Sequence, residues 1–239
     1  MTRLRDLERL YSLLHDLERR VGELRVLANC SNRMNWPLRG IYFFFEPNEA
    51  RLDSGSGLRV VRVGTHALIS GAKSTLWQRL SQHRGQNRGG GNHRGSIFRL
   101  LVGQALIKRD GLRAASWGIG SDVTQAAGRL NIAREAVQEQ ERPIEIGVSS
   151  HIGRLPFLWL SVDDPPDSKS DRGLLERNCI GLLSNYGKHQ LDPPSQNWLG
   201  SYSEREKVRS SNLWNNNHVD ESYDPDFFEV LERHINSMT

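Results

Sequence analysis

The sequence has no long hydrophobic run and few cysteines. No window holds the ~20 consecutive apolar residues that a transmembrane helix needs, so a membrane-spanning protein is excluded. The first residues, MTRLRDLERLYSLL, lack the apolar stretch of a secretory signal. The two cysteines, Cys30 and Cys179, lie far apart and lack metal-ligand spacing. We therefore expect neither a disulfide framework nor a structural zinc site, and a cytoplasmic location.

Several catalytic motifs are also missing. The sequence contains no Gly-x-Ser-x-Gly of serine hydrolases and no His-Glu-x-x-His of zinc proteases. The glycine-rich stretch 89–95 is not followed by the Lys-Ser/Thr pair of a nucleotide-binding P-loop. These absences exclude the commonest hydrolase and nucleotide-binding classes.

The composition is that of a globular protein with a basic region. The 239 residues are 37% hydrophobic, which suits one large domain or a compact core with an insertion. The net charge is only +4, but one stretch of 41 residues has nine basic side chains against a single acidic one, Asp110. These nine are Lys73, Arg79, Arg84, Arg88, Arg94, Arg99, Lys108, Arg109 and Arg113. Such a run indicates a phosphate-rich partner, although a solvated surface has the same pattern.

Hydrophobic periodicity gives the order of elements. An amphipathic helix is predicted over 3–27, because apolar residues recur at three- and four-residue steps. Strands are predicted at 40–45, 58–63 and 155–162 from their β-branched and aromatic content, with a loop at 46–57. Further helices are predicted at 75–83, 96–108, near 122–140, at 174–183 and at 224–235, whereas 188–223 is predicted to be mostly loop.

Short motifs fall on these elements in a recognisable order. Gly40-Ile41-Tyr42 opens the first strand, and Arg62-Val63-Gly64 ends the second. The next helix has Arg79 and, four residues later, His83, and a later helix carries Glu176. Asn185 lies just beyond that helix. In this order, the five elements resemble the GIY-YIG nuclease superfamily over residues 39–85 and 154–187. The stretches HRGSIFR and LWNNNHVDE are similar to those of a bacterial subgroup with this core.

The resemblance implies an α+β fold. A small three-stranded antiparallel sheet flanked by helices is expected, with a large helical insertion and additional N- and C-terminal helices. The expected organisation is an N-terminal helix and linker at 1–38, a nuclease core at 39–187 interrupted by an insertion at 85–153, and a C-terminal extension at 188–239.

The resemblance also implies roles for the motif residues. Glu176 would hold Mg²⁺ (or Mn²⁺), which accepts a single carboxylate because it keeps several waters. Arg79 would bind the phosphate, and His83, on the same helix face, would transfer a proton or contact phosphate. Tyr42 would activate water; an unperturbed tyrosine, with a pKa near ~10, needs cations beside it for this. Arg79 and Arg62 are the candidate sources of that positive charge.

The sequence departs from the family pattern in three places. Arg62 replaces the tyrosine of the second motif, so any role of that hydroxyl is lost. Nineteen residues, 43–61, link the two motifs, which predicts an extended hairpin tip. Asn185 follows Glu176 by nine residues, closer than the family pattern, so Asn197 is an alternative. A helix C-cap explains Asn185 equally well.

Two segments outside the core are candidates for substrate contact. The basic, glycine-rich loop 85–95 offers Arg88, His93 and Arg94 to DNA, together with the preceding Arg84, but an ordinary surface loop explains it as well. The stretch 213–221 has side chains able to read bases or support a metal. A loop structured by side-chain-to-backbone bonds is the more conservative interpretation.

The leading hypothesis is a metal-dependent endonuclease acting on DNA, in restriction, defence or repair. The alternative, motivated by Arg62, is a nucleic-acid-binding module with the same fold and no cleavage. A third is an interaction protein built on the N-terminal helix. A palindromic target would predict a homodimer.

Overall fold

A four-stranded antiparallel sheet forms the centre of the computed structural model, which describes residues 2–86, 89–167 and 169–238. Its strands follow the order β1-β4-β2-β3. They are β1 (Arg25–Val26), β2 (Gly40–Ala50), β3 (Leu58–Gly64) and β4 (Pro156–Ser161). The two long strands therefore lie side by side, with the first motif on one and the second motif on the other.

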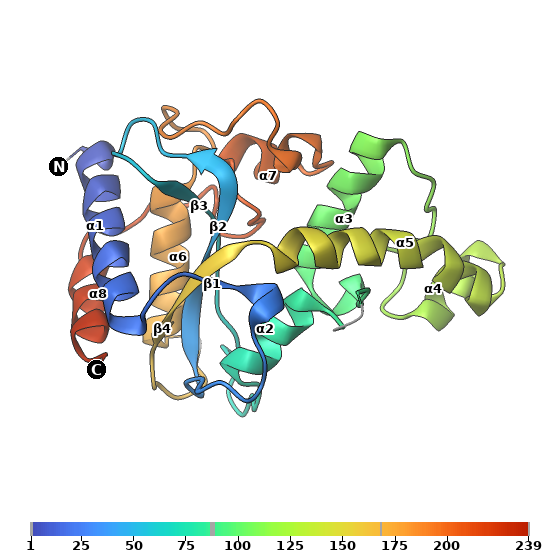
Figure 1. Ribbon diagram of the computed structural model, residues 1–239, viewed down its shortest axis with the longest axis horizontal. Helices are drawn as coiled ribbons and strands as arrows, with labels where there is room; N and C mark the ends of the chain where they lie inside the picture. The colour runs from blue at the N-terminus through green and yellow to red at the C-terminus, as the bar shows by residue number, and fades with distance from the viewer. Residues whose placement is uncertain (1, 87–88, 168, 239) are drawn as a thin grey trace.

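Helices cover both faces of this sheet (Figure 1). α1 (Arg3–Val21), α6 (Asp171–Leu183) and α8 (Phe227–Asn236) lie on one side. α2 (Leu76–Arg84), α3 (Ile97–Asp110) and α5 (Arg134–Gly153) lie on the other, with α4 (Val123–Leu130) at the far end of the insertion. α7 (Glu206–Ser211) belongs to the C-terminal extension. Among the described residues, no helix is long and apolar enough to cross a membrane.

The alternation of β2 divides the core into two. Ile41, Phe43 and Phe45 point to the hydrophobic cluster that includes α1, α6 and α8. Tyr42 and Phe44 point to the other cluster, with α2, α3 and α5. Because successive strand side chains face opposite ways, the motif tyrosine is directed toward the face that the insertion covers.

The α+β class with added helices is confirmed, and several boundaries are corrected. The sheet has four strands rather than three, because the expected first helix ends at Val21 and Arg25–Val26 pairs with β4. Gly22, with φ +88°, terminates the helix. β2 continues through the predicted loop to Ala50, with register shifts after Phe44 and Phe45 that accommodate polar residues.

The insertion and the C-terminal extension are more helical than predicted. Two helices, α4 and α5, replace the single one near 122–140, because Asn131 adopts a left-handed backbone with φ 52° and ends α4. α5 then runs through Pro143 to Gly153. The short α7 lies in the stretch expected to be loop.

The C-terminal extension is attached to the sheet around a buried carboxyl group. The indole nitrogens of Trp198 and Trp214 donate to Oε2 of Glu46, at 3.1 and 3.3 Å. His151 Nε2 lies 3.4 Å from Oε1. Burial is the main cause that raises the pKa of Glu46 to about 7, and burial lowers the pKa of His151 to about 4. The extension therefore packs over a carboxyl group that resists ionisation.

The raised pKa of Glu46 predicts a pH-dependent stability. The unfolded chain ionises at about 4.5 and the folded chain at about 7, so the favourable contribution present below pH 4.5 is lost as pH rises to 7. The loss amounts to about 3 kcal/mol. We expect Glu46→Gln, which keeps the acceptor for the indoles, to remove this loss. Urea unfolding of both proteins at pH 5 and pH 8 measures it; equal pH dependence in the two would contradict the prediction.

Candidate active site

Tyr42 is fully buried at the centre of the sheet, and its hydroxyl group is hydrogen-bonded to His83. It pairs across β2 and β3 with Gly64, and its oxygen lies 2.8 Å from Nε2 of His83. A β-carbon on Gly64 would lie 2.4 Å from the Tyr42 oxygen. The last glycine of the second motif is therefore required because the tyrosine ring lies against the backbone at that position.

His83 is held on α2 by local sequence. Thr75 accepts from the backbone of Gln78, and Gln78 reciprocates in a capping box that fixes the start of the helix. His83 then lies two turns later, fully buried. Burial, then the nearby guanidinium groups, lowers the pKa of His83 well below its usual value. The imidazole is therefore neutral at pH 7, and one of its two ring nitrogens is a hydrogen-bond acceptor.

Arg62 occupies the position of the second-motif tyrosine and is buried beside Tyr42. It donates to the carbonyl of Trp214, and its guanidinium lies 4.7 Å from the ring centre of Phe98. Burial lowers the pKa of Arg62, and the neighbouring Tyr42 and Glu176 partly offset this effect. The site thus contains a buried cation where the family pattern has a hydroxyl.

Glu176 lies on α6 on the other side of this cluster and is partly exposed. Its Oε1 accepts a hydrogen bond from the backbone of Thr65, at 3.1 Å, just after the second motif. Burial raises the pKa of Glu176, and Arg62 is the largest influence in the opposite direction. The carboxyl also lines a cavity of about 470 Å³, together with His218 and Asn178.

The donor set at Glu176 fits a hydrated divalent cation. Within the described residues, no group of three or more His, Cys, Asp or Glu side chains is arranged to enclose a metal. A single carboxylate beside an open cavity suits Mg²⁺, which keeps most of its water ligands, and does not suit a closed structural zinc site. A bound cation would also favour the ionised carboxylate that burial disfavours.

The structure thus brings five of the sequence-predicted residues into one cluster. Tyr42 and His83 are hydrogen-bonded. Arg62 and Glu176 each shift the pKa of the other, and Arg79 lies near enough to lower the pKa of both. Arg79 is the most accessible cation of the group, and it bonds Gln82 and the carbonyl of Gly95 at the edge of the insertion.

Asn185 does not belong to this cluster. Its amide oxygen accepts from Arg3 and from the backbone of Leu191, and its nitrogen donates to Leu191 and Asn212. It therefore ties α1 to the C-terminal extension. The alternative, Asn197, is exposed and lines a cavity beside Glu46, likewise apart from Tyr42.

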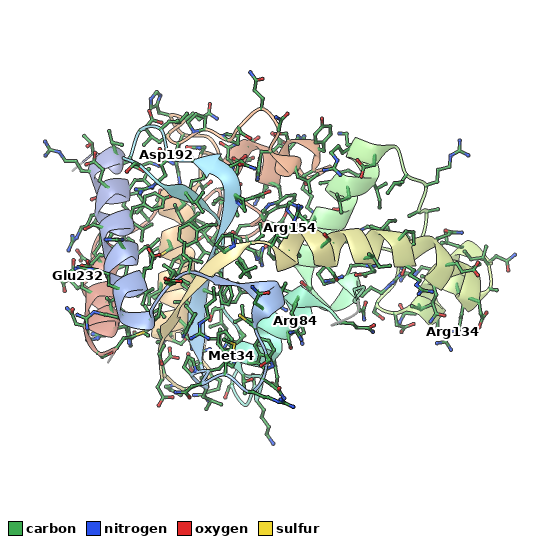
Figure 2. All side chains as sticks on the ribbon, viewed as in Figure 1. Met34, Arg84, Arg134, Arg154, Asp192 and Glu232 are labelled. Atoms are coloured by element: carbon green, nitrogen blue, oxygen red, sulfur yellow. The ribbon has the colours of Figure 1, made fainter. Side chains whose placement is uncertain are left out.

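The glycine-rich loop also differs from its interpretation as a DNA-contacting segment. His93 and Arg94 are buried side chains that anchor α5: His93 bonds Glu145, and Arg94 makes a bidentate pair with Glu141, both bonds at 2.7 Å. Arg84 donates to the carbonyl of Cys30 and lies over Trp77, whereas Arg134 lies at the distant end of the insertion (Figure 2). Arg88 lies outside the described residues.

The segment 213–218 is held by side-chain-to-backbone bonds, the more conservative of the two interpretations that the sequence allows. The side-chain amide of Asn215 bonds the backbone N–H and carbonyl of Val63. The backbone N–H of Trp214 donates to the carbonyl of Val61, so the segment runs along the outer edge of β3. It then brings His218 to the cavity beside Glu176. His218 has a left-handed backbone, φ 63°, and bonds Glu221 at 2.7 Å. In the sequence, only the unusual Asn- and His-rich composition of this segment indicated that it has a structural or functional role.

The close approach of Tyr42 to Gly64 gives a stability prediction. In Gly64→Ala the new methyl group must displace the tyrosine ring, so we expect unfolding to become easier by about 1–3 kcal/mol. The matched control is Gly128→Ala in α4. There the added β-carbon meets no neighbouring atom within 4 Å, and alanine favours the helix. Urea unfolding measures both. If Gly64→Ala were as stable as the unaltered protein, the ring would not be confined as described.

Comparison with known proteins adds one finding. No curated protein and no solved structure matches the sequence. The family model described as a GIY-YIG domain matches residues 1–239, which include the insertion and both terminal extensions as well as the motifs. The chain therefore belongs to the GIY-YIG nuclease superfamily.

Proposed function

We propose that this chain is an endonuclease that hydrolyses phosphodiester bonds of DNA with Mg²⁺ or Mn²⁺ held at Glu176. The observation that carries the proposal is the buried hydrogen bond between Tyr42 and a neutral His83, with Arg62 beside it and Glu176 across from it. An acceptor for a proton, a source of positive charge and a metal ligand are the components that phosphodiester hydrolysis requires.

In this proposal the side chains divide the chemistry between them. The Tyr42 oxygen takes a proton from the attacking water while its own proton moves to Nε2 of His83. The water oxygen forms a bond to phosphorus as the ester bond breaks. Arg62 stabilises negative charge on the tyrosine oxygen, and Arg79, at the open side, binds the phosphate. Glu176 would hold the divalent cation, which would supply positive charge to stabilise the phosphate and the leaving oxygen.

The insertion supports DNA as the substrate through its exposed cations rather than through its glycine-rich loop. Exposed arginines occur at 113, 129, 134 and 142, and Figure 2 shows Arg134 far from the sheet. These side chains are free to contact phosphates distant from the cleaved bond. A duplex crossing from Arg79 toward α4 is consistent with this distribution.

The first test is nicking of supercoiled plasmid with Mg²⁺ or Mn²⁺. We expect Glu176→Gln to abolish metal-dependent nicking, because the neutral amide is a poor ligand for a divalent cation. EDTA should do the same. The control is Glu229→Gln, an exposed carboxylate on α8, which should cut normally. Cleavage that survives Glu176→Gln would place the metal elsewhere.

The same assay separates the endonuclease from the alternative. A protein that retains salt-sensitive DNA binding, without cleavage by the unaltered chain on any tested duplex, would favour the binding module motivated by Arg62. Binding is measured by mobility shift at two salt concentrations.

The replacement of the second-motif tyrosine gives another prediction. We expect Arg62→Gln to slow single-turnover cleavage by about 100-fold, because a buried cation beside the tyrosine oxygen is removed. Arg62→Lys, which keeps the charge but loses the bond geometry to Trp214, should be less affected. Equal rates for all three proteins would show that Arg62 has only a packing role.

A further inference from the structure

The Tyr42–His83 pair has a third member, which comes from the insertion. The second ring nitrogen of His83, Nδ1, lies 2.8 Å from the hydroxyl oxygen of Ser96. Ser96 is 1% exposed and His83 is fully buried, so no water competes for this bond. Ser96 is also the N-cap of α3 and accepts from the backbone of Arg99 at 3.3 Å.

The residues around Ser96 hold the same histidine from a second direction. Arg99 donates to the backbone carbonyl of His83 at 2.9 Å. Glu145, on α5, accepts from Arg99 Nε at 3.1 Å and from His93 Nδ1 at 2.9 Å. Burial alone raises the pKa of Glu145, but its bonds to His93 and Arg99 outweigh burial and lower it. The carboxylate therefore stays ionised and neutralises Arg99.

The glycine-rich loop completes this support. A β-carbon on Gly91 would lie 2.4 Å from the guanidinium carbon of Arg99, so the loop backbone covers the arginine directly. The glycine-rich loop and the HRGSIFR stretch are therefore in direct contact, because Gly91 lies against Arg99 of that stretch. The loop backbone thus covers Arg99, which, like Ser96, bonds His83.

The bond from Ser96 has a consequence for the ring of His83. A neutral imidazole has one N–H and one acceptor nitrogen, and the partner of one nitrogen determines the role of the other. If Ser96 accepts from Nδ1–H, then Nε2 is the acceptor and faces the Tyr42 hydroxyl. The opposite tautomer would direct the Nε2–H of His83 at the Tyr42 oxygen. His83 would then have no acceptor nitrogen facing the hydroxyl proton of Tyr42.

We propose that Ser96, held by Arg99 and Glu145, is a positioning residue that fixes the Nδ1–H tautomer of His83 and so prepares Nε2 to accept the proton of Tyr42. This inference rests on the proposed nuclease function. It also assigns the insertion a part in the chemistry, because the hydroxyl lies outside the segments that carry the family motifs. The charged groups facing His83 are Arg62 from β3, Arg79 from α2 and Arg99 from α3.

The first experiment reads the tautomer without any cleavage. Nitrogen-15 NMR of the imidazole in the full chain at pH 7.5 should show a protonated Nδ1 and an unprotonated Nε2 for His83, assigned with His83→Gln. Ser96→Gly should lose this preference. A wild-type His83 with its proton on Nε2 would overturn the proposal, whatever the protein does to DNA.

The second experiment separates positioning from helix capping. Glycine caps a helix almost as well as serine, whereas alanine does not. If Ser96 positions His83, Ser96→Gly and Ser96→Ala should both lower kcat at least about 10-fold with KM unchanged. Asp122→Ala, which removes the cap of α4 instead, should cut normally. Wild-type kcat in Ser96→Gly would reduce Ser96 to a cap and overturn the proposal.

The two experiments fail independently. If the unaltered chain cuts no DNA, the nuclease proposal fails, and the NMR measurement still decides whether Ser96 selects the tautomer. If the chain cuts DNA and the tautomer does not depend on Ser96, the positioning role alone is overturned. Thermal unfolding of each variant verifies that it is folded.

Discussion

The hydrogen bond between Tyr42 and His83 is the interaction on which the site depends, because it is buried and joins separately built elements. The tyrosine reaches it only in the observed β2–β3 register, in which Gly64 leaves room for the ring. The histidine reaches it only if α2 starts at its capping box. A shift of one residue in either element would separate the two polar atoms and leave both unsatisfied, at a cost of roughly 1–3 kcal/mol each.

Buried charge makes the insertion part of the core rather than an appendage. The ion pairs Arg94–Glu141 and Arg99–Glu145 are almost fully removed from water. Such pairs add little net stability, since desolvation offsets their attraction, but breaking one leaves an uncompensated charge. These ion pairs therefore fix the glycine-rich loop and α3 to α5 in one specific arrangement. Two of the cations that composition assigned to a nucleic acid, Arg94 and Arg99, are therefore used inside the protein.

The sequence was most informative where local rules decide the structure. The order of strands and helices follows from periodicity, and the positions of Tyr42, His83 and Glu176 on them follow from the resemblance to the family motifs. The remaining parts of the site could not be predicted, because they depend on contacts between segments that are distant in the sequence. Asn185 stands just beyond α6 as the motif order predicts, yet its amide is used to bind Arg3 and the C-terminal extension. The segment around Asn215 reaches the site only because it pairs with the edge of β3, which no local pattern encodes.

Arg62 shows how a departure from the family motif can be accommodated by its surroundings. A guanidinium in the interior needs compensation, and the chain supplies a carbonyl from Trp214, the ring of Phe98 and the nearby charge of Glu176. Trp214 in turn is fixed by Val61 and Glu46. The C-terminal extension thus supplies contacts that the buried arginine needs. A tyrosine hydroxyl at this position would need a hydrogen-bond partner but no compensation of charge, so the carbonyl and the ring that the arginine contacts go together with the substitution.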